Sequence, residues 1–379
     1  MKPAIYLDYQ ASTPVDPRVA ELVAEVSAEA YSNPHAEDHA GGWRAAEVIV
    51  TARRQIAQAI GADADEVYFT SGATEADNIG VLGAALGAPE GRNRIIVSAF
   101  EHKAVLECAA AARRHGFTIE TAAIKPDGLV DLEALDRQLS DDVAVVSIMT
   151  VNNEIGTIQP IAEVAERAAR SGAFIHTDAT QAPLAMDVDV FEWGVDAASF
   201  SSHKVHGPKG VGALYLSSSA PWRPSPLMYG GGQEQGLRPG TLPTPLCAGF
   251  GMAMTLINPA ERSRVALLRD RLAMLLKTSF PSLRVTCESS ERHPGCLHLH
   301  LPGRDAKDVA TRLQPSVLIS TGSACTSGVM HGSHVLLSLG WSVEAAQEGL
   351  RISLGRLTTD AEIEAASELI GRVLAVRAD

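Results

Sequence analysis

The chain has 379 residues, of which 46% are hydrophobic and 20% charged, a composition typical of a globular protein with a substantial core. Its net charge of −13 argues against a broad, sequence-independent grip on nucleic acid or on an anionic membrane. The five cysteines are scattered and contain no Cys-x-x-Cys pair, so neither a disulfide framework nor a metal site is expected.

The N-terminal residues contain no apolar core long enough for a signal peptide, and no uninterrupted apolar run approaches the length of a membrane span. Scattered, reduced thiols are typical of proteins in a reducing compartment. We therefore expect a cytoplasmic protein without a membrane partner.

Short strands and longer helices alternate through the first two thirds of the chain. Residues 42–60 carry apolar side chains at helical spacing and end at Gly61. Buried strands are predicted at residues 66–70, 94–98, 143–148, 174–178 and 197–200. Each of these strands runs into polar residues, at the edge where open α/β sheets bind ligands. The alternation predicts an α/β fold with a mostly parallel central sheet flanked by helices.

The pattern changes after about residue 260 to a helix, short strands at residues 283–286 and 296–301, and a closing helix over residues 360–376. We expect three parts. An N-terminal segment (residues 1–15) packs with a small domain, residues 16–258 form the large cofactor-binding domain, and residues 259–379 form the small α+β domain with the Cys325 loop.

Lys204 follows the predicted strand 197–200 and stands among small hydroxyl residues. An amine held there is well placed to form a Schiff base with pyridoxal phosphate (PLP), while the hydroxyls hold the phosphate. Taken alone, the motif is better explained as an ordinary surface lysine in a glycine-rich loop. Other sites along the chain favour the cofactor.

Two segments are suited to the phosphate. Residues 70–75 link a strand to a helix, so the backbone N–H groups near Ala73 can bind an anion and Thr74 adds a hydroxyl. A simple helix cap explains this motif equally well. Ser201 and His203, beside the lysine, complete the expected phosphate cup.

Other side chains are suited to the pyridine ring. Asp178 ends a predicted strand, where a buried carboxylate can pair with a protonated ring nitrogen, and Gln181 can donate to the ring hydroxyl. His102 begins a helix and can stack on the ring and move protons near neutral pH. Alone, Asp178 and His102 would more often be capping residues.

Asn153 and Arg351 suit a bidentate hold on a substrate α-carboxylate, although each alone would more often serve structure. Cys325 stands in a run of small and hydroxyl residues that predicts an exposed, mobile loop. Such a thiol can approach a cofactor and carry sulfur away as a persulfide; the alternative is an incidental loop cysteine. The other four cysteines are interpreted as packing residues.

Together these segments resemble the cysteine desulfurases of the class V aminotransferase superfamily, in the branch with a Ser-Ala-Cys-Thr-Ser flexible loop. The similarity runs nearly end to end. It is carried by residues 6–9, 33–34, 69–78, 101–103, 152–154, 176–181, 202–204, 207–210, 230–234, 238–241, 322–327 and 351–356.

The resemblance implies the fold type I PLP architecture, with a large PLP-binding domain and a smaller α+β C-terminal domain. It implies that Lys204 carries PLP, that Cys325 takes sulfur from L-cysteine as a persulfide, and that L-alanine leaves. It implies that His102 is the stacking acid/base and that Thr241 reaches the phosphate of a partner subunit, which makes the protein a homodimer.

Three departures from the family pattern bear on function. Gln10 stands where alanine is usual, which alters the wall on the substrate side, and Gln235 replaces a usual arginine at a rim or inter-subunit contact. The chain ends at Asp379, whereas housekeeping members carry a longer tail that helps to hold the iron–sulfur scaffold protein. The sulfur acceptor is therefore left open between an iron–sulfur scaffold and a tRNA-thiolation or DNA-phosphorothioation enzyme.

Two other interpretations stay open. One is a different PLP enzyme, such as an aminotransferase or a selenocysteine lyase, in which Cys325 is idle. The other is a catalytically silent relative that acts as a scaffold, against which the joint retention of Lys204, Asp178 and Cys325 argues.

Overall fold

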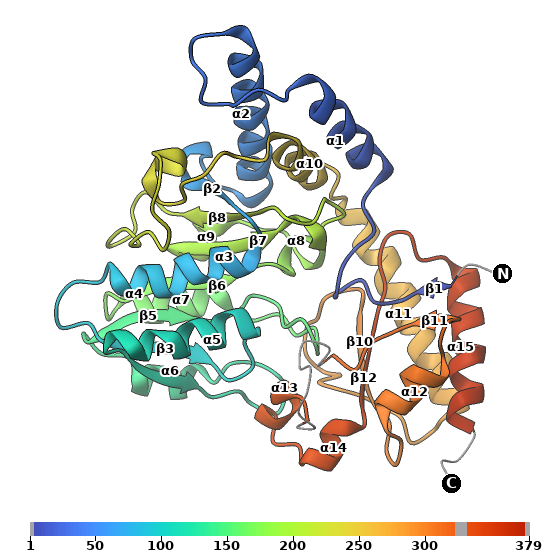
Figure 1. Ribbon diagram of the computed structural model, residues 1–379. Coiled ribbons are helices and arrows are strands. Elements are labelled where there is room, and N and C mark those ends of the chain that lie inside the picture. Colours follow the sequence, from blue (N-terminus) through green and yellow to red (C-terminus); the bar gives the residue numbers. More distant parts are fainter. Residues whose placement is uncertain (1–3, 323–331, 376–379) are drawn as a thin grey trace.

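The computed structural model describes residues 4–322 and 332–375. Within them, a seven-stranded sheet has the strand order β2-β8-β7-β6-β5-β3-β4 (Figure 1). Its strands are β2 (Val67–Thr70), β3 (Arg94–Ser98), β4 (Thr118–Ala122), β5 (Val143–Ser147), β6 (Phe174–Asp178), β7 (Ala197–Ser201) and β8 (Gly212–Leu216). Strands β3 to β7 pair in parallel, whereas β8 runs antiparallel to β2 and β7. The predicted α/β fold with a mostly parallel sheet is confirmed.

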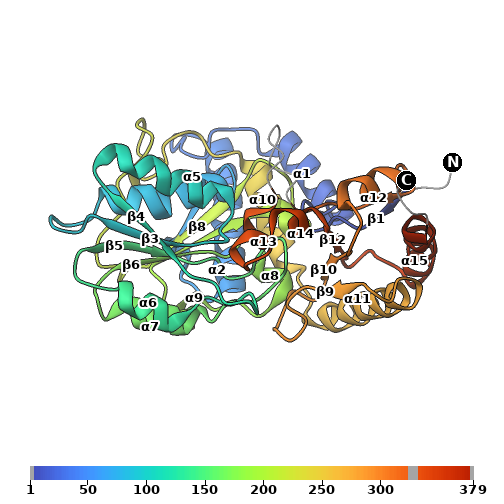
Figure 2. The ribbon, with the colours of Figure 1, turned by 90° about the horizontal axis from the view of Figure 1, so that it is seen from below.

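Helices cover both faces of this sheet, with α5 on one side and α6 and α7 on the other (Figure 2). Strands β5 and β6 are consequently buried along their whole length, which explains the apolar run Val143–Val146 in β5. The helices are α1 (Pro17–Glu29), α2 (Ala40–Ile60), α3 (Ala73–Asn78), α4 (Ala84–Leu86), α5 (Lys103–Ala112), α6 (Leu132–Gln138), α7 (Ile161–Ala169), α8 (Ala182–Ala185), α9 (Val190–Trp193) and α10 (Thr244–Thr255). Short turns are η1 (Ala64–Glu66), η2 (Ile79–Gly83), η3 (Arg113–His115), η4 (Ser202–Lys204) and η5 (Gln233–Gly236).

Helix α2 illustrates how local sequence sets an element. His39 caps its first turn by accepting from the Gly42 backbone N–H (3.1 Å). At its other end Gly61 adopts a left-handed conformation with φ of 71°, which ends the helix. The side chains of Ile49 and Ile56 are buried on the face that packs toward α10 and the sheet. The helix predicted over residues 42–60 is therefore confirmed, with its start two residues earlier.

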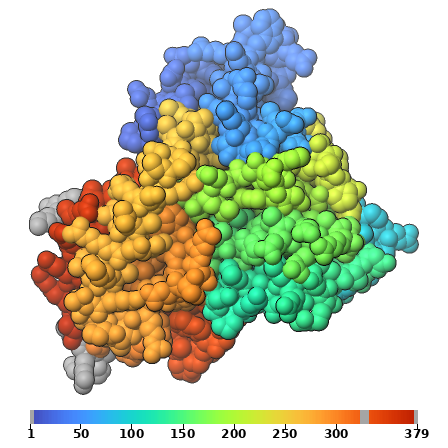
Figure 3. All heavy atoms as spheres, turned by 180° about the vertical axis from the view of Figure 1, so that it is seen from behind, coloured from blue at the N-terminus to red at the C-terminus, as the bar shows by residue number. Residues whose placement is uncertain are grey.

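A second, three-stranded antiparallel sheet has the order β12-β10-β9. Its elements are β9 (Arg284–Val285), β10 (Cys296–His300) and β12 (Gly349–Ser353), with helices α11 (Pro259–Ser279), α12 (Ala306–Arg312), α13 (His334–Ser338), α14 (Val343–Gln347) and α15 (Asp360–Ala375). The residues from α11 onward gather on one side of the molecule, coloured orange to red in Figure 3. The domain boundaries at residues 15 and 258 stay predictions. No helix in the described part of the chain is long and apolar enough to cross a bilayer.

The N-terminal segment connects the two sheets. Strand β1 (Ile5–Tyr6) pairs in parallel with β11 (Val317–Leu318), and Leu7 is fully buried in the core between α11, α15 and β12. The segment then reaches the large sheet, where the Thr13 backbone N–H donates to the His203 carbonyl oxygen (2.9 Å). This path brings residues 8–12 to the region between the two sheets.

Candidate active site

A cavity of about 460 Å³ opens at the C-terminal ends of β5, β6 and β7. This is the edge at which open α/β sheets bind ligands. Most of the site residues that the sequence predicts line this one cavity. They are Ala73, Thr74, His102, Asn153, Asp178, Gln181, Ser201, His203, Lys204 and Arg351. Thr241 is exposed and does not line the cavity, and Cys325 lies outside the described residues.

Lys204 ends the short turn η4, directly after β7. Its Nζ donates to the backbone carbonyl oxygens of Gln10 (2.5 Å) and Ala11 (3.0 Å). The amine therefore lies at the cavity wall, held by a segment nearly 200 residues away in sequence (204 − 10 = 194).

The phosphate-binding prediction places two segments at the same end of the cavity. Gly72 is the residue before α3, so the backbone N–H groups of Ala73 and Thr74 belong to the first turn of a helix. Ser201 and His203 approach from β7 and η4. Burial lowers the pKa of His203 to about 4, so its ring is neutral at pH 7. Helix N–H groups and hydroxyls are the donors that a phosphate requires.

Asp178, the last residue of β6, accepts a hydrogen bond from the Thr180 backbone N–H through Oδ1 (2.9 Å). The buried carboxyl of Asp77 lies behind it, and burial followed by the nearby charge of Asp178 raises the Asp77 pKa well above its ordinary value. Between them the His176 ring contacts two serine hydroxyls, and burial lowers its pKa to about 4. His176 is therefore neutral near pH 7, burial favours the protonated form of Asp77, and Asp178 is the acidic side chain of this group that lines the cavity.

His102 is the residue before α5, and its Nδ1 accepts from the Ala104 backbone N–H (3.1 Å). Burial lowers the His102 pKa, so the neutral ring carries its proton on Nε2. A neutral imidazole in the cavity wall can stack on a ring and move a proton. The Gln181 Nε2, predicted to donate to a ring hydroxyl, donates to the Gln10 carbonyl oxygen (3.0 Å).

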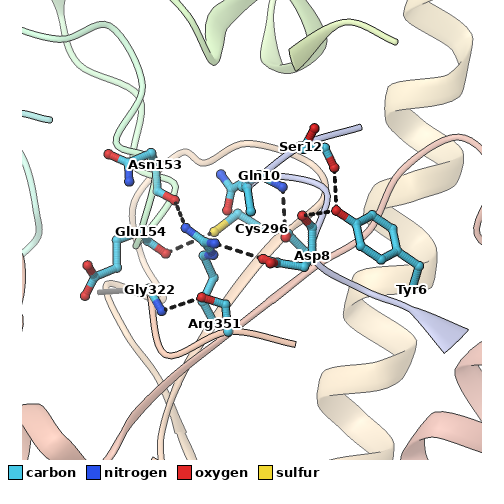
Figure 4. Close-up of polar contacts among 12 residues, drawn as sticks. Tyr6, Asp8, Gln10, Ser12, Asn153, Glu154, Cys296, Gly322 and Arg351 are labelled. Atoms are coloured by element: carbon cyan, nitrogen blue, oxygen red, sulfur yellow. Dashed lines mark hydrogen bonds and ion pairs between the residues drawn. The ribbon is translucent and has the colours of Figure 1, made fainter. Parts of the chain in front are cut away.

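The Arg351 guanidinium lies between two partners, as Figure 4 shows. Nη1 donates to the Asn153 carbonyl oxygen (2.7 Å), and Nη2 pairs with Asp8 Oδ1 (2.9 Å). The side chain is 3% exposed, and its Nε has no hydrogen-bond partner in the described residues. Arg351 and Asn153, which are predicted to hold a substrate carboxylate together, therefore lie in contact through the Asn153 backbone, and Arg351 Nε remains a buried donor without a partner in the described residues.

Asp8 and Glu101 also lie at the site, although no local pattern in the sequence predicts a role for either. Asp8 reaches Arg351 because β1 pairs with β11, a long-range pairing that no local pattern in the sequence indicates. Glu101 is fully buried beside His102, and its Oε1 accepts from Ser98 Oγ (2.5 Å) and from the Met149 backbone N–H (2.7 Å). Burial raises the pKa of Glu101 to about 8.

The residues of this cavity fit PLP. They supply an amine, a carboxylate, a neutral imidazole and a helix start flanked by hydroxyls, in one cavity of suitable size for a small ligand. Thr180 Oγ1, also in the cavity wall, is buried without a partner in the described residues, as expected where a polar ligand binds.

Residues 5–366 match the family model described as aminotransferase class-V. The chain is 39% identical to the cysteine desulfurase IscS of Rickettsia felis, over 97% of this chain and 90% of that protein. Its fold matches a solved NifS-like protein with a TM-score of 0.91 and 31% identity, covering 98% of this chain and 100% of that chain. It also matches SspA in complex with cysteine, with a TM-score of 0.83 and 32% identity over 94% and 100% of the two chains.

The chain belongs to the aminotransferase class-V family, whose members of this type depend on PLP. Its similarity over nearly the whole length is to cysteine desulfurases, so the predicted family and cofactor are confirmed.

Proposed function

We propose that this protein is a PLP-dependent cysteine desulfurase that converts L-cysteine to L-alanine and leaves a persulfide on Cys325. The observation that carries the proposal is a single cavity that contains the Lys204 amine, the Asp178 carboxylate and the Arg351 guanidinium. The cysteine bound to SspA, which has the same fold, supports the choice of substrate.

Each of these groups has a task in such a reaction. PLP, held by Lys204, supplies an electron sink that labilises the Cα–H and Cβ–S bonds of a bound amino acid. Asp178 favours the protonated ring nitrogen, which strengthens that sink. Arg351 and Asn153 orient the substrate carboxylate. Lys204 or the neutral His102 then moves the Cα proton.

The sulfur step belongs to Cys325. Its thiolate attacks the substrate sulfur, an S–S bond forms as the Cβ–S bond breaks, and the carbon skeleton keeps the electron pair, takes up a proton and leaves as L-alanine. Gly322, three residues before Cys325 (325 − 322), lines the cavity. This proximity in sequence to a residue of the cavity wall supports Cys325 as the sulfur carrier.

The four cysteines in the described residues are poor candidates for this step. Burial raises the pKa of the thiol in every one of them, to about 12 for Cys108 and about 11 for Cys287 and Cys296. The thiolate is the nucleophilic form, so these thiols are almost unreactive at neutral pH. This comparison favours Cys325 as the sulfur carrier.

We also propose an oligomeric state, a cellular location and a class of sulfur acceptor. The protein is a cytoplasmic homodimer in which Thr241 reaches the PLP phosphate of the partner subunit. It passes sulfur from Cys325 to an acceptor protein, either an iron–sulfur scaffold or a nucleic-acid thiolation enzyme. The exposure of Thr241, outside the cavity of its own chain, is compatible with a contact made across a subunit interface.

Two variants test the proposal with L-cysteine as substrate. Lys204→Ala should lose the visible absorbance of bound PLP and all alanine formation, because the cofactor has no amine to hold it. Cys325→Ser should keep that absorbance and lose the protein-bound persulfide. A persulfide that survives on the Cys325→Ser protein, or a wild-type enzyme that forms no alanine, would refute the proposal.

A further inference from the structure

The side chain of Gln10 is buried in the cavity wall, and its amide group lacks hydrogen-bond partners among the described residues. It is 2% exposed, and neither Nε2 nor Oε1 has a hydrogen-bond partner in the described residues. Both backbone polar groups of Gln10 make hydrogen bonds. Its carbonyl oxygen accepts from Lys204 Nζ (2.5 Å), and its N–H donates to Ser353 Oγ (3.0 Å). A buried amide that lacks partners destabilises a protein unless a ligand completes its hydrogen bonds.

The groups around the Gln10 amide are poor hydrogen-bond partners for it. Figure 4 shows the Gln10 side chain beside Cys296, close to the Arg351 guanidinium. The Cys296 thiol, whose pKa burial raises to about 11, donates instead to the Glu154 carbonyl oxygen (3.4 Å). The Cys296 thiol also contacts the Gln10 side chain, but a thiol is a weak hydrogen-bond partner for an amide. Among the described residues the Gln10 amide therefore has no strong partner, and a ligand in the cavity can supply one.

A second unpartnered donor lines the same cavity. Within residues 4–322 and 332–375, the buried Arg351 Nε has no acceptor, although the two terminal nitrogens of that guanidinium are bound to Asp8 and Asn153. Gln10 Nε2 and Arg351 Nε thus require acceptors in one small space. A carboxylate has two oxygens and accepts several hydrogen bonds, so one carboxylate can satisfy both donors.

We infer that Gln10 is a specificity-determining residue whose Nε2 donates a hydrogen bond to the α-carboxylate of the bound amino acid, beside Arg351. The inference rests on the proposed function, because it names a further contact to the substrate of the same site. Such a contact favours amines that carry a carboxylate over amines that lack one.

The test compares two ligands that differ only in the carboxylate. L-alanine and ethylamine share an amine and a two-carbon unit, and neither contains sulfur. Their dissociation constants are measured by titration of the PLP absorbance and by calorimetry, on the PLP-loaded wild type and on Gln10→Met, which keeps the side-chain length but removes both polar atoms. Gln347→Ala, at an exposed glutamine in α14, is the matched control.

Loss of a hydrogen bond to a charged group should weaken L-alanine binding to Gln10→Met roughly 10- to 100-fold and leave ethylamine binding unchanged. The KM for L-cysteine should rise with it. Gln10→Ala, which removes the amide together with most of the side chain, should give the same pattern and guards against misfolding of Gln10→Met. Equal losses for the two ligands, or no loss for L-alanine, would overturn the inference. A wild type that binds L-alanine with this preference but makes no alanine from cysteine would refute the proposed desulfurase and still support the role of Gln10.

Discussion

Several buried ionisable side chains lie near Asp178, behind the residues that line the cavity. Burial raises the pKa of Asp77 and Glu101 and lowers that of His176. In each case burial favours the neutral form of the side chain. Of these acidic groups, Asp178 is the one that lines the cavity, where a protonated pyridine nitrogen requires a carboxylate.

The raised pKa of Glu101 should be measurable through the pH dependence of the free energy of unfolding. Its pKa is about 8 in the folded protein and about 4.5 when unperturbed, so between these values the folded state holds a proton that the unfolded state releases. Stability should therefore fall as the pH rises through this window and level off above pH 8. Glu101→Gln, which keeps the acceptor for Ser98, removes this dependence. We expect the loss of unfolding free energy between pH 5 and pH 8 to shrink by roughly 2–4 kcal/mol.

Urea unfolding at several pH values checks this expectation. Glu107→Gln, at an exposed glutamate of α5, is the control and should follow the wild type. A Glu101→Gln profile that runs parallel to the wild type would show that Glu101 ionises normally in the folded protein.

At the scale of elements, the connection from β2 to α3 depends on a close contact with β8. A Cβ on Gly212, at the start of β8, would lie 2.6 Å from the Gly72 Cα and 2.6 Å from the Phe200 carbonyl oxygen. Both are backbone atoms, which cannot move aside without shifting the strand or the helix start. Glycine at residue 212 therefore lets the proposed phosphate-binding turn pack against the sheet.

Gly212→Ala should accordingly destabilise the protein by about 1–3 kcal/mol, the usual cost of overpacking, and weaken PLP retention. Gly232→Ala is the control, because a Cβ there meets nothing within 4 Å. Thermal unfolding and PLP release on dialysis provide the two measurements. If both variants behave like the wild type, the contact between Gly72 and Gly212 does not shape the turn.

The elements that the sequence predicted well are those with a strong local signal. Residues 174–178 form β6 with the expected bounds, because the strand begins with two large apolar residues and ends at the polar edge of the sheet. The cavity residues on the ends of β6 and β7 follow from that register. The contacts of Asp8 and Gln10 were beyond prediction, since they depend on pairing across more than 300 residues (317 − 5 = 312). The orientation of Arg351 toward Asp8 was missed for the same reason.

At the scale of the whole molecule, the predicted phosphate contact of Thr241 is not explained by the cavity of its own chain. It is exposed and lies outside the cavity, so a role in phosphate binding requires a second copy of the chain. We expect a dimer in sedimentation velocity, and about tenfold weaker PLP binding by Thr241→Ala, as for a lost hydrogen bond to a charged group.

Thr255→Ala, at an exposed threonine of α10, serves as the control and should bind PLP like the wild type. PLP affinity is measured at a protein concentration where the dimer persists. Unchanged affinity in Thr241→Ala would place this residue outside the cofactor site of either subunit.

The pairing of β1 with β11, and of Asp8 with Arg351, also has a temporal consequence. On the ribosome, residues 5–11 emerge first and must wait for residues 317–353. At about 5–20 residues per second, that delay is at least roughly 15 seconds. The carbonyl groups that position the Lys204 amine are therefore in place only after residues 317–353 have been made. Capture of the vitamin-derived aldehyde must then follow the synthesis of that distant segment.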